Sequence, residues 1–154
     1  MFSFLLIVHG LLAVALLGAL THQAISVLWP ARQRTGSFVS SLRSVPSATY
    51  TNAIIVLFIV TAIFGSIIYT EYRVSIRSTL RDYRLFIPEG SFELKEHFLS
   101  IGLGLLPAYW YYWRPSVAKD FSATRVIVTT LLAAIVWYAF ITGHVLNDIR
   151  GFGS

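Results

Sequence analysis

Residues Ser91 to Arg114 read SFELKEHFLSIGLGLLPAYWYYWR and change from charged to apolar within a few positions. Three charged residues precede His97, and the positions after it carry no charge up to an aromatic cluster at Tyr109 to Trp113. Aromatic side chains gather where a membrane helix leaves the hydrocarbon. The stretch therefore predicts a transmembrane helix over about 92–113 with a polar entrance.

The overall composition agrees with a membrane protein. Of the 154 residues, 56% are hydrophobic and 12% are charged, against a charged fraction of about 25% in soluble domains. The net charge of +5 comes from basic residues scattered at the ends of apolar runs, so we expect lipid headgroups, and no nucleic acid, as their partners. Cysteine is absent, which excludes disulfides, thiolate metal sites and c-type haem attachment within the chain.

Three further apolar runs complete a predicted all-α bundle of four transmembrane helices, which forms a single membrane domain over 1–154. An apolar run of about 20 residues is long enough to cross the hydrocarbon. The first run has no basic residues before it, so we expect a retained helix and not a cleaved signal peptide. The predicted transmembrane helices are 2–29, 50–70, 92–113 and 124–148.

An amphipathic segment follows the second apolar run. Between residues 72 and 87, apolar side chains recur every three or four positions, and arginines follow with the same spacing. This spacing gives a helix one apolar and one basic face, and such helices lie at the membrane surface. We predict an interfacial helix over about 72–87, ended by Pro88 to Gly90, with Ser91 capping the next helix. Its arginines are Arg73, Arg77, Arg81 and Arg84.

Three of the four histidines are predicted to lie at one level of the bundle. Four crossings put both termini on one side, so His9, His97 and His144 come to the same face. His22 lies roughly 20 Å from His9 along the helix axis, toward the opposite face. Ionisable side chains inside a bilayer are costly and usually face the bundle interior. We therefore expect the first three histidines to converge.

Imidazole groups that converge from different helices can hold a haem. We favour haem b with His9 and His144 as its ligands, while His97 is a substitute ligand or a polar group at a quinone-sized pocket. Arg73 and Arg77 are predicted to reach the same face, and guanidinium groups pair well with carboxylates such as haem propionates.

Other interpretations of the histidines stay open. His97 can be an interfacial residue in a hydrated rim, and His22 can hydrogen-bond across helices. His9, His97 and His144 can instead form a copper or zinc site, with Glu93 as a further ligand.

Four short helices with few histidines and small loops resemble, in architecture, the b-type membrane anchor subunits of respiratory complexes such as succinate dehydrogenase or formate dehydrogenase. The likeness covers the helix layout and no residue motif, so it assigns no family. It implies electron transfer between a quinone pool and a partner subunit, with this chain positioning the cofactor. The alternative is a non-catalytic accessory or assembly subunit of a larger membrane complex, without its own cofactor.

Partners and orientation follow from the aromatic and basic residues. The aromatic cluster is broader than one helix rim requires, and the arginine row suits an acidic partner, so we expect other subunits in a hetero-oligomeric complex. Basic residues divide evenly between the two predicted sides, so the positive-inside rule chooses no orientation. Because only the far end of the first helix carries arginines, we expect extracytoplasmic termini in a bacterial inner membrane.

Overall fold

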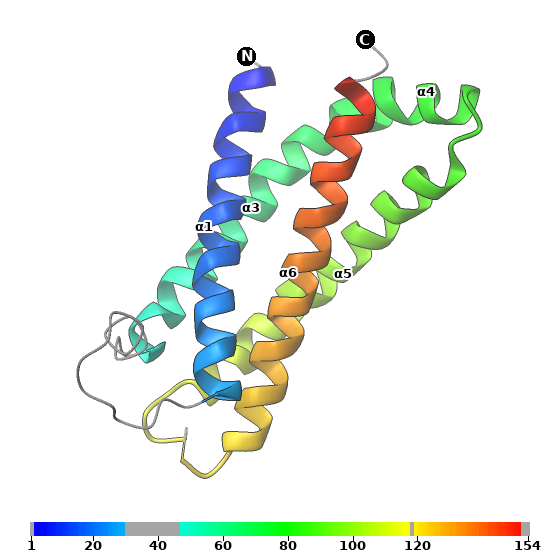
Figure 1. The fold of residues 1–154 in the computed structure, drawn as a ribbon. Coiled ribbons are helices and arrows are strands. Elements are labelled where there is room, and N and C mark those ends of the chain that lie inside the picture. The colour runs from blue at the N-terminus through cyan, green and yellow to red at the C-terminus, as the bar shows by residue number, and fades with distance from the viewer. Residues whose placement is uncertain (1, 30–46, 118, 152–154) are drawn as a thin grey trace.

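The computed structural model describes residues 2–29, 47–117 and 119–151. In this part of the chain, four long helices run alternately up and down, and the first and last helices bring the two ends of the chain to the same end of the bundle (Figure 1). The elements are α1 (Phe2–Leu28), the 3-10 turn η1 (Ser47–Tyr50), α3 (Thr51–Glu71), the π turn η2 (Tyr72–Ile76), α4 (Arg77–Asp82), α5 (Phe86–Tyr112) and α6 (Ser122–Gly151).

Three stretches of helix are long and apolar enough to cross a membrane, namely Ser3–Leu28, Ala48–Asp82 and Ser122–Asp148. These stretches are compatible with an integral membrane protein. Helix α5 is not among them, because four charged residues fall in its first half and only its second half is continuously uncharged. The fourth transmembrane span therefore stays a prediction.

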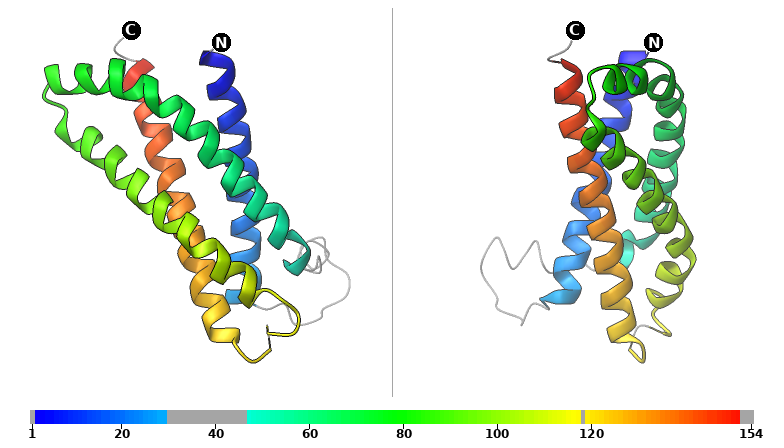
Figure 2. Two further views of the ribbon diagram at one scale, coloured as in Figure 1. Left: turned by 180° about the vertical axis from the view of Figure 1, so that it is seen from behind. Right: turned by 90° about the vertical axis from the view of Figure 1, so that its right-hand side faces the viewer.

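Helix α3 continues into α4 through a single π turn, η2. The helix bends there, so that α4 runs across the end of the bundle that carries the termini (Figures 1 and 2). Wider turns of this kind accompany bends within helices. Of the predicted apolar stripe, Tyr72 and Leu80 are buried while Tyr83 and Ile87 are exposed. An amphipathic interfacial helix over 72–87 is thus not confirmed, and α4 is a short extension of α3.

The connection between α4 and α5 comes earlier than the sequence predicts. Arg84 has a φ of 56°, which is the left-handed conformation that ends many helices. The N–H of Leu85 donates to the oxygen of Leu80 at 2.7 Å, and the N–H of Arg84 donates to the oxygen of Arg81 at 2.9 Å. These two bonds form a Schellman motif.

Helix α5 consequently begins at Phe86, and the predicted break at Pro88 to Gly90 is wrong. Pro88 falls in the first turn, where the backbone N–H that proline lacks has no partner within the helix. Ser91 is likewise a helical residue and does not cap the helix.

The hydrophobic core lies in the half of the bundle farther from the termini. There, the second halves of α1 and α5 pack against the first halves of α3 and α6, whereas the connection between α4 and α5 spreads away from α1 at the other end (Figure 2). The buried core side chains are Leu16, Leu20, Ile54, Phe58, Leu106, Tyr109, Trp113, Val128, Leu132 and Val136.

Polar side chains inside this core are paired across helices. The hydroxyl of Tyr109 donates to Oε1 of Gln23, and Nε2 of Gln23 lies 3.4 Å from Oγ1 of Thr51. The indole N–H of Trp113 donates to Oγ1 of Thr129 at 2.9 Å. Because buried polar groups are costly when unpaired, these contacts fix how the helices pack.

Candidate functional site

A cavity of about 430 Å³ lies among α1, α3, α5 and α6. This volume is within the range of small-molecule and cofactor sites, which is roughly 300 to 1,000 Å³. Most of its wall is apolar, with contributions from Leu16, Phe58 and Leu99. Its polar lining comes from His9, Thr61, Ser66, Lys95, Glu96, Ser100, His144 and Asn147.

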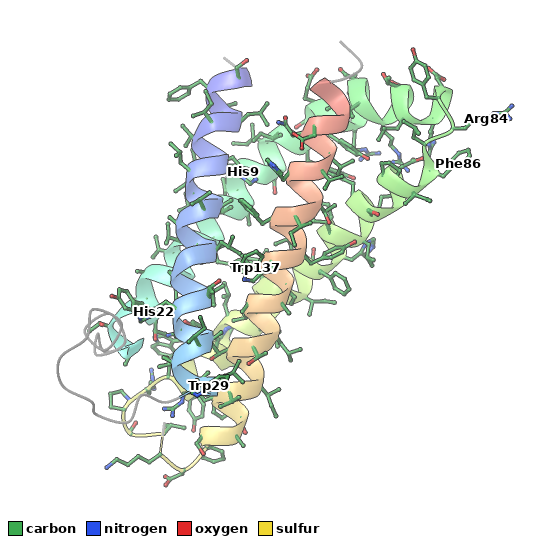
Figure 3. All side chains as sticks on the ribbon, viewed as in Figure 1. His9, His22, Trp29, Arg84, Phe86 and Trp137 are labelled. Atoms are coloured by element: carbon green, nitrogen blue, oxygen red, sulfur yellow. The ribbon has the colours of Figure 1, made fainter. Side chains whose placement is uncertain are left out.

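His9 lines this cavity from α1, on the side of α1 that faces α3 (Figure 3). Its ring lies against Gly65, where an added Cβ would be 3.2 Å from Cε1 of the imidazole. Nδ1 of His9 is buried and has no hydrogen-bond partner, and the same is true of Oγ1 of Thr61 on α3. Buried polar atoms are usually hydrogen-bonded, so these two atoms stand out within the wall that α1 and α3 form.

His144 lines the same cavity from α6. Its side chain is 70% exposed, and its Nε2 lies 3.8 Å from Oδ2 of Asp148. The ring lies parallel to that of Phe140, one turn earlier, with 6.4 Å between centroids. His9 and His144 therefore reach one cavity from two helices, with His9 partly buried and His144 at the open edge.

His97 is exposed and is not part of the cavity lining. Its Nδ1 lies 2.7 Å from the carbonyl oxygen of Glu93 in its own helix. The adjacent Glu96 does line the cavity, so His97 shares the level of the site but occupies another face of α5. Within the described ranges, no three histidine, aspartate or glutamate side chains are grouped so that they could hold a metal ion.

The two arginines predicted for the site lie outside the cavity lining. Arg73 is exposed, and its guanidinium carbon is 6.0 Å from the centroid of the Tyr69 ring. Nε of Arg77 lies 2.8 Å from Oε1 of Glu89, and its Nη2 lies 2.6 Å from Oε1 of Glu93. Arg77 is thus engaged by carboxylates of α5.

Glu89 joins α4 to α5. Besides the contact with Arg77, its Oε1 accepts a hydrogen bond from Nε of Arg81 at 2.7 Å. The hydrogen bond from Arg77 is the largest effect and lowers the pKa of Glu89. Burial opposes it, and the hydrogen bond from Arg81 lowers the pKa further. The carboxylate is therefore charged at neutral pH and holds two arginines of the preceding turns.

Lys95 also lines the cavity, although its place in the sequence did not indicate a site residue. Its Nζ is 2.9 Å from Oε1 of Glu96 and 3.9 Å from the centroid of the Phe92 ring, and its side chain is 13% exposed. Phe92 is itself stacked on Tyr72 with 3.7 Å between centroids. A helix that began at residue 92 would leave Lys95 at the rim, whereas the observed start at Phe86 places it more than two turns inside α5.

His22 lies farther along α1, toward the core end of the bundle (Figure 3). Its ring meets that of Tyr50 edge to face, with 5.7 Å between centroids. His22 is not among the residues that line the cavity.

No family model matches this chain, and neither a curated protein nor a solved structure matches it. Functional inference therefore depends on the cavity and the side chains around it.

Proposed function

We propose that this chain is a haem b-binding subunit of a membrane electron-transfer complex, passing electrons to or from a quinone or a partner subunit. The observation that carries the proposal is that His9 and His144 line one largely apolar cavity from α1 and α6. Histidine nitrogen is a common axial ligand of haem iron. In helix bundles, cofactor sites are built from side chains on facing helices.

The cavity suits a flat macrocycle in several ways. Gly10 and Gly143 are among its lining residues and add no side chain to its volume, while Gly65 makes room for the imidazole of His9. The close contact between His9 and Gly65 restricts the orientation of the imidazole. A ligand that filled the cavity would also cover its apolar walls.

A haem bound here would supply one-electron redox chemistry. The chain would hold it with His9 and His144, exclude water with the apolar side chains from α1, α3 and α5, and orient it through the packing of the imidazole on Gly65. We keep His97 as a polar group that faces a quinone or a partner, since it is exposed at the level of the cavity.

We further propose that α5 completes a four-span bundle in a bacterial inner membrane, with both termini extracytoplasmic. The start of α1 and the end of α6 lie at the same end of the bundle (Figure 1), which supports placing both termini on one side of the membrane. In the sequence, α1 contains no arginine, and arginines follow only after its far end. The cavity would then lie near the extracytoplasmic face. A tag at either terminus should be cleaved by protease added to spheroplasts, and protection of both tags would reverse this orientation.

The second candidate is an accessory subunit without its own cofactor, within a hetero-oligomeric complex. It is favoured by the exposed aromatic side chains Trp110 and Tyr111 on α5, which could dock a partner helix. The haem content of the complex purified in mild detergent separates the two candidates. About one extractable haem for each copy of this chain supports the first, and a complex without haem supports the second.

A further inference from the structure

The described lining of the cavity includes one lysine, Lys95, and no arginine. Only 13% of this side chain is exposed, although an ammonium group is costly to bury without compensation. The groups around Lys95 therefore determine how its positive charge is compensated.

The neighbours of Lys95 satisfy it incompletely. An ammonium group has three donors, and one of them is directed at Oε1 of Glu96, 2.9 Å away. Glu96 is the next residue in the chain, and both side chains line the cavity. The ring of Phe92 supports the charge from one side at 3.9 Å, as cation–π pairs do.

We infer that Lys95 binds a carboxylate of the ligand in this cavity, which under the proposed function is a propionate of haem b. This inference rests on the proposed function. Lysine pairs with carboxylates through charge-assisted hydrogen bonds, and the aromatic stack behind Phe92 holds the ammonium at the cavity wall. Lys95 takes the role that the sequence suggested for Arg73 and Arg77.

The positions of Arg73 and Arg77 support assigning the carboxylate contact to Lys95. Arg77 is held by Glu89 and Glu93, and Arg73 lies at an exposed position beside Tyr69. Neither arginine lines the cavity. Removing Arg73 should therefore leave the ligand unaffected, which makes it the matched control for Lys95.

The test is a redox titration of the purified complex carrying Lys95→Met, Lys95→Arg, Glu96→Gln or Arg73→Met. A nearby positive charge stabilises the reduced haem, so Lys95→Met should shift the reduction equilibrium about tenfold toward the oxidised form, or about 59 mV for one electron. Lys95→Arg and Arg73→Met should stay near the wild-type value. Glu96→Gln should raise the potential, because it removes a competing negative charge.

Haem transfer to an excess of a haem-scavenging apoprotein provides the second readout. Loss of a carboxylate contact should speed transfer from Lys95→Met about tenfold, as expected for a lost charge-assisted hydrogen bond, and Lys95→Arg should restore slow transfer. If Lys95→Met does not accumulate, Lys95→Gln takes its place in both readouts. Wild-type potential and transfer rate in both Lys95→Met and Glu96→Gln would overturn it while leaving the haem in place. A wild-type complex without haem would instead overturn the proposed function itself.

Discussion

The imidazole of His9 on α1 lies against Gly65 on α3, so closely that a Cβ at position 65 would be 3.2 Å from Cε1. This contact places a partly buried histidine against a position where any side chain larger than that of glycine requires the imidazole to shift. The orientation of His9, the proposed haem ligand, therefore depends on how α1 packs against α3.

Gly65→Ala should displace the ring of His9 by a few tenths of an ångström and lower the haem content of the purified complex. The fold should change little, because alanine favours the helix by roughly 0.5–1 kcal/mol over glycine. Haem absorbance per protein and the thermal unfolding midpoint measure the two effects. Gly18→Ala is the control, since a Cβ there meets no atom within 4 Å. Equal haem content in both variants would argue against the role of this contact.

Gly102→Ala should destabilise the bundle, because a Cβ at Gly102 would be 2.6 Å from Cζ of Phe58 and 3.4 Å from Cγ2 of Ile135. Phe58 is fully buried and has little room to move. Overpacking of this kind costs about 1–3 kcal/mol. Unfolding in detergent measures the loss, with Gly104→Ala as the control because its Cβ would point into open space. If Gly102→Ala were as stable as Gly104→Ala, the close packing of α3 on α5 would be wrong.

Tyr109→Phe should weaken the core, because it removes the hydroxyl that donates to Oε1 of Gln23. Loss of one partner of a buried hydrogen bond costs about 1–3 kcal/mol. Tyr111→Phe removes an exposed hydroxyl from the same helix and should be near neutral. Denaturant or thermal unfolding of the two variants in one detergent provides the comparison, and similar stabilities would contradict the buried pairing.

Glu89→Gln should remove an acid-dependent part of the stability. Hydrogen bonds from Arg77 and Arg81 lower the pKa of Glu89 from its ordinary value of about 4.5. A carboxyl with a lowered folded-state pKa stabilises the fold above the unfolded-state value, and this stabilisation is lost as the pH falls through the lowered value.

The unfolding midpoint of the wild type should therefore exceed that of Glu89→Gln at neutral pH, and the difference should shrink in acid below the ordinary pKa. Asp82→Asn, at an exposed carboxylate nearby, should keep the wild-type profile. If the difference in unfolding midpoint between wild type and Glu89→Gln did not change with pH, the stabilisation that Glu89 gives through Arg77 and Arg81 would not depend on its charge.

The sequence predicted α1, α3 and α6 within a few residues of their observed bounds, since long uncharged runs have few ways to satisfy their backbone other than a helix. It missed the start of α5 by six residues, from 92 to Phe86. The residue that ends α4 in the left-handed conformation is Arg84, where glycine is usual. Pro88 and Gly90 are more usual turn residues than Arg84, so the sequence placed the turn at 88–90, within what is α5 in the structure.

Depth along a helix can be counted from the sequence, but rotation about its axis cannot. Counting placed His9 and His144 at one level, and both line the cavity. The same counting could not show that His97 faces outward while Lys95 and Glu96 face inward, because that rotation is set by how α5 packs on its neighbours. The pairing of His9 with His144 on a haem stays a prediction.

The most direct measurement is a reduced-minus-oxidised visible spectrum of the purified complex, recorded for the wild type and for His9→Ala, His144→Ala, His97→Ala and His22→Ala. We expect a b-type signal in the wild type that is lost in His9→Ala and His144→Ala and kept in the other two variants. A wild-type complex without a b-type signal, or a signal that survives in both His9→Ala and His144→Ala, would contradict the central claim.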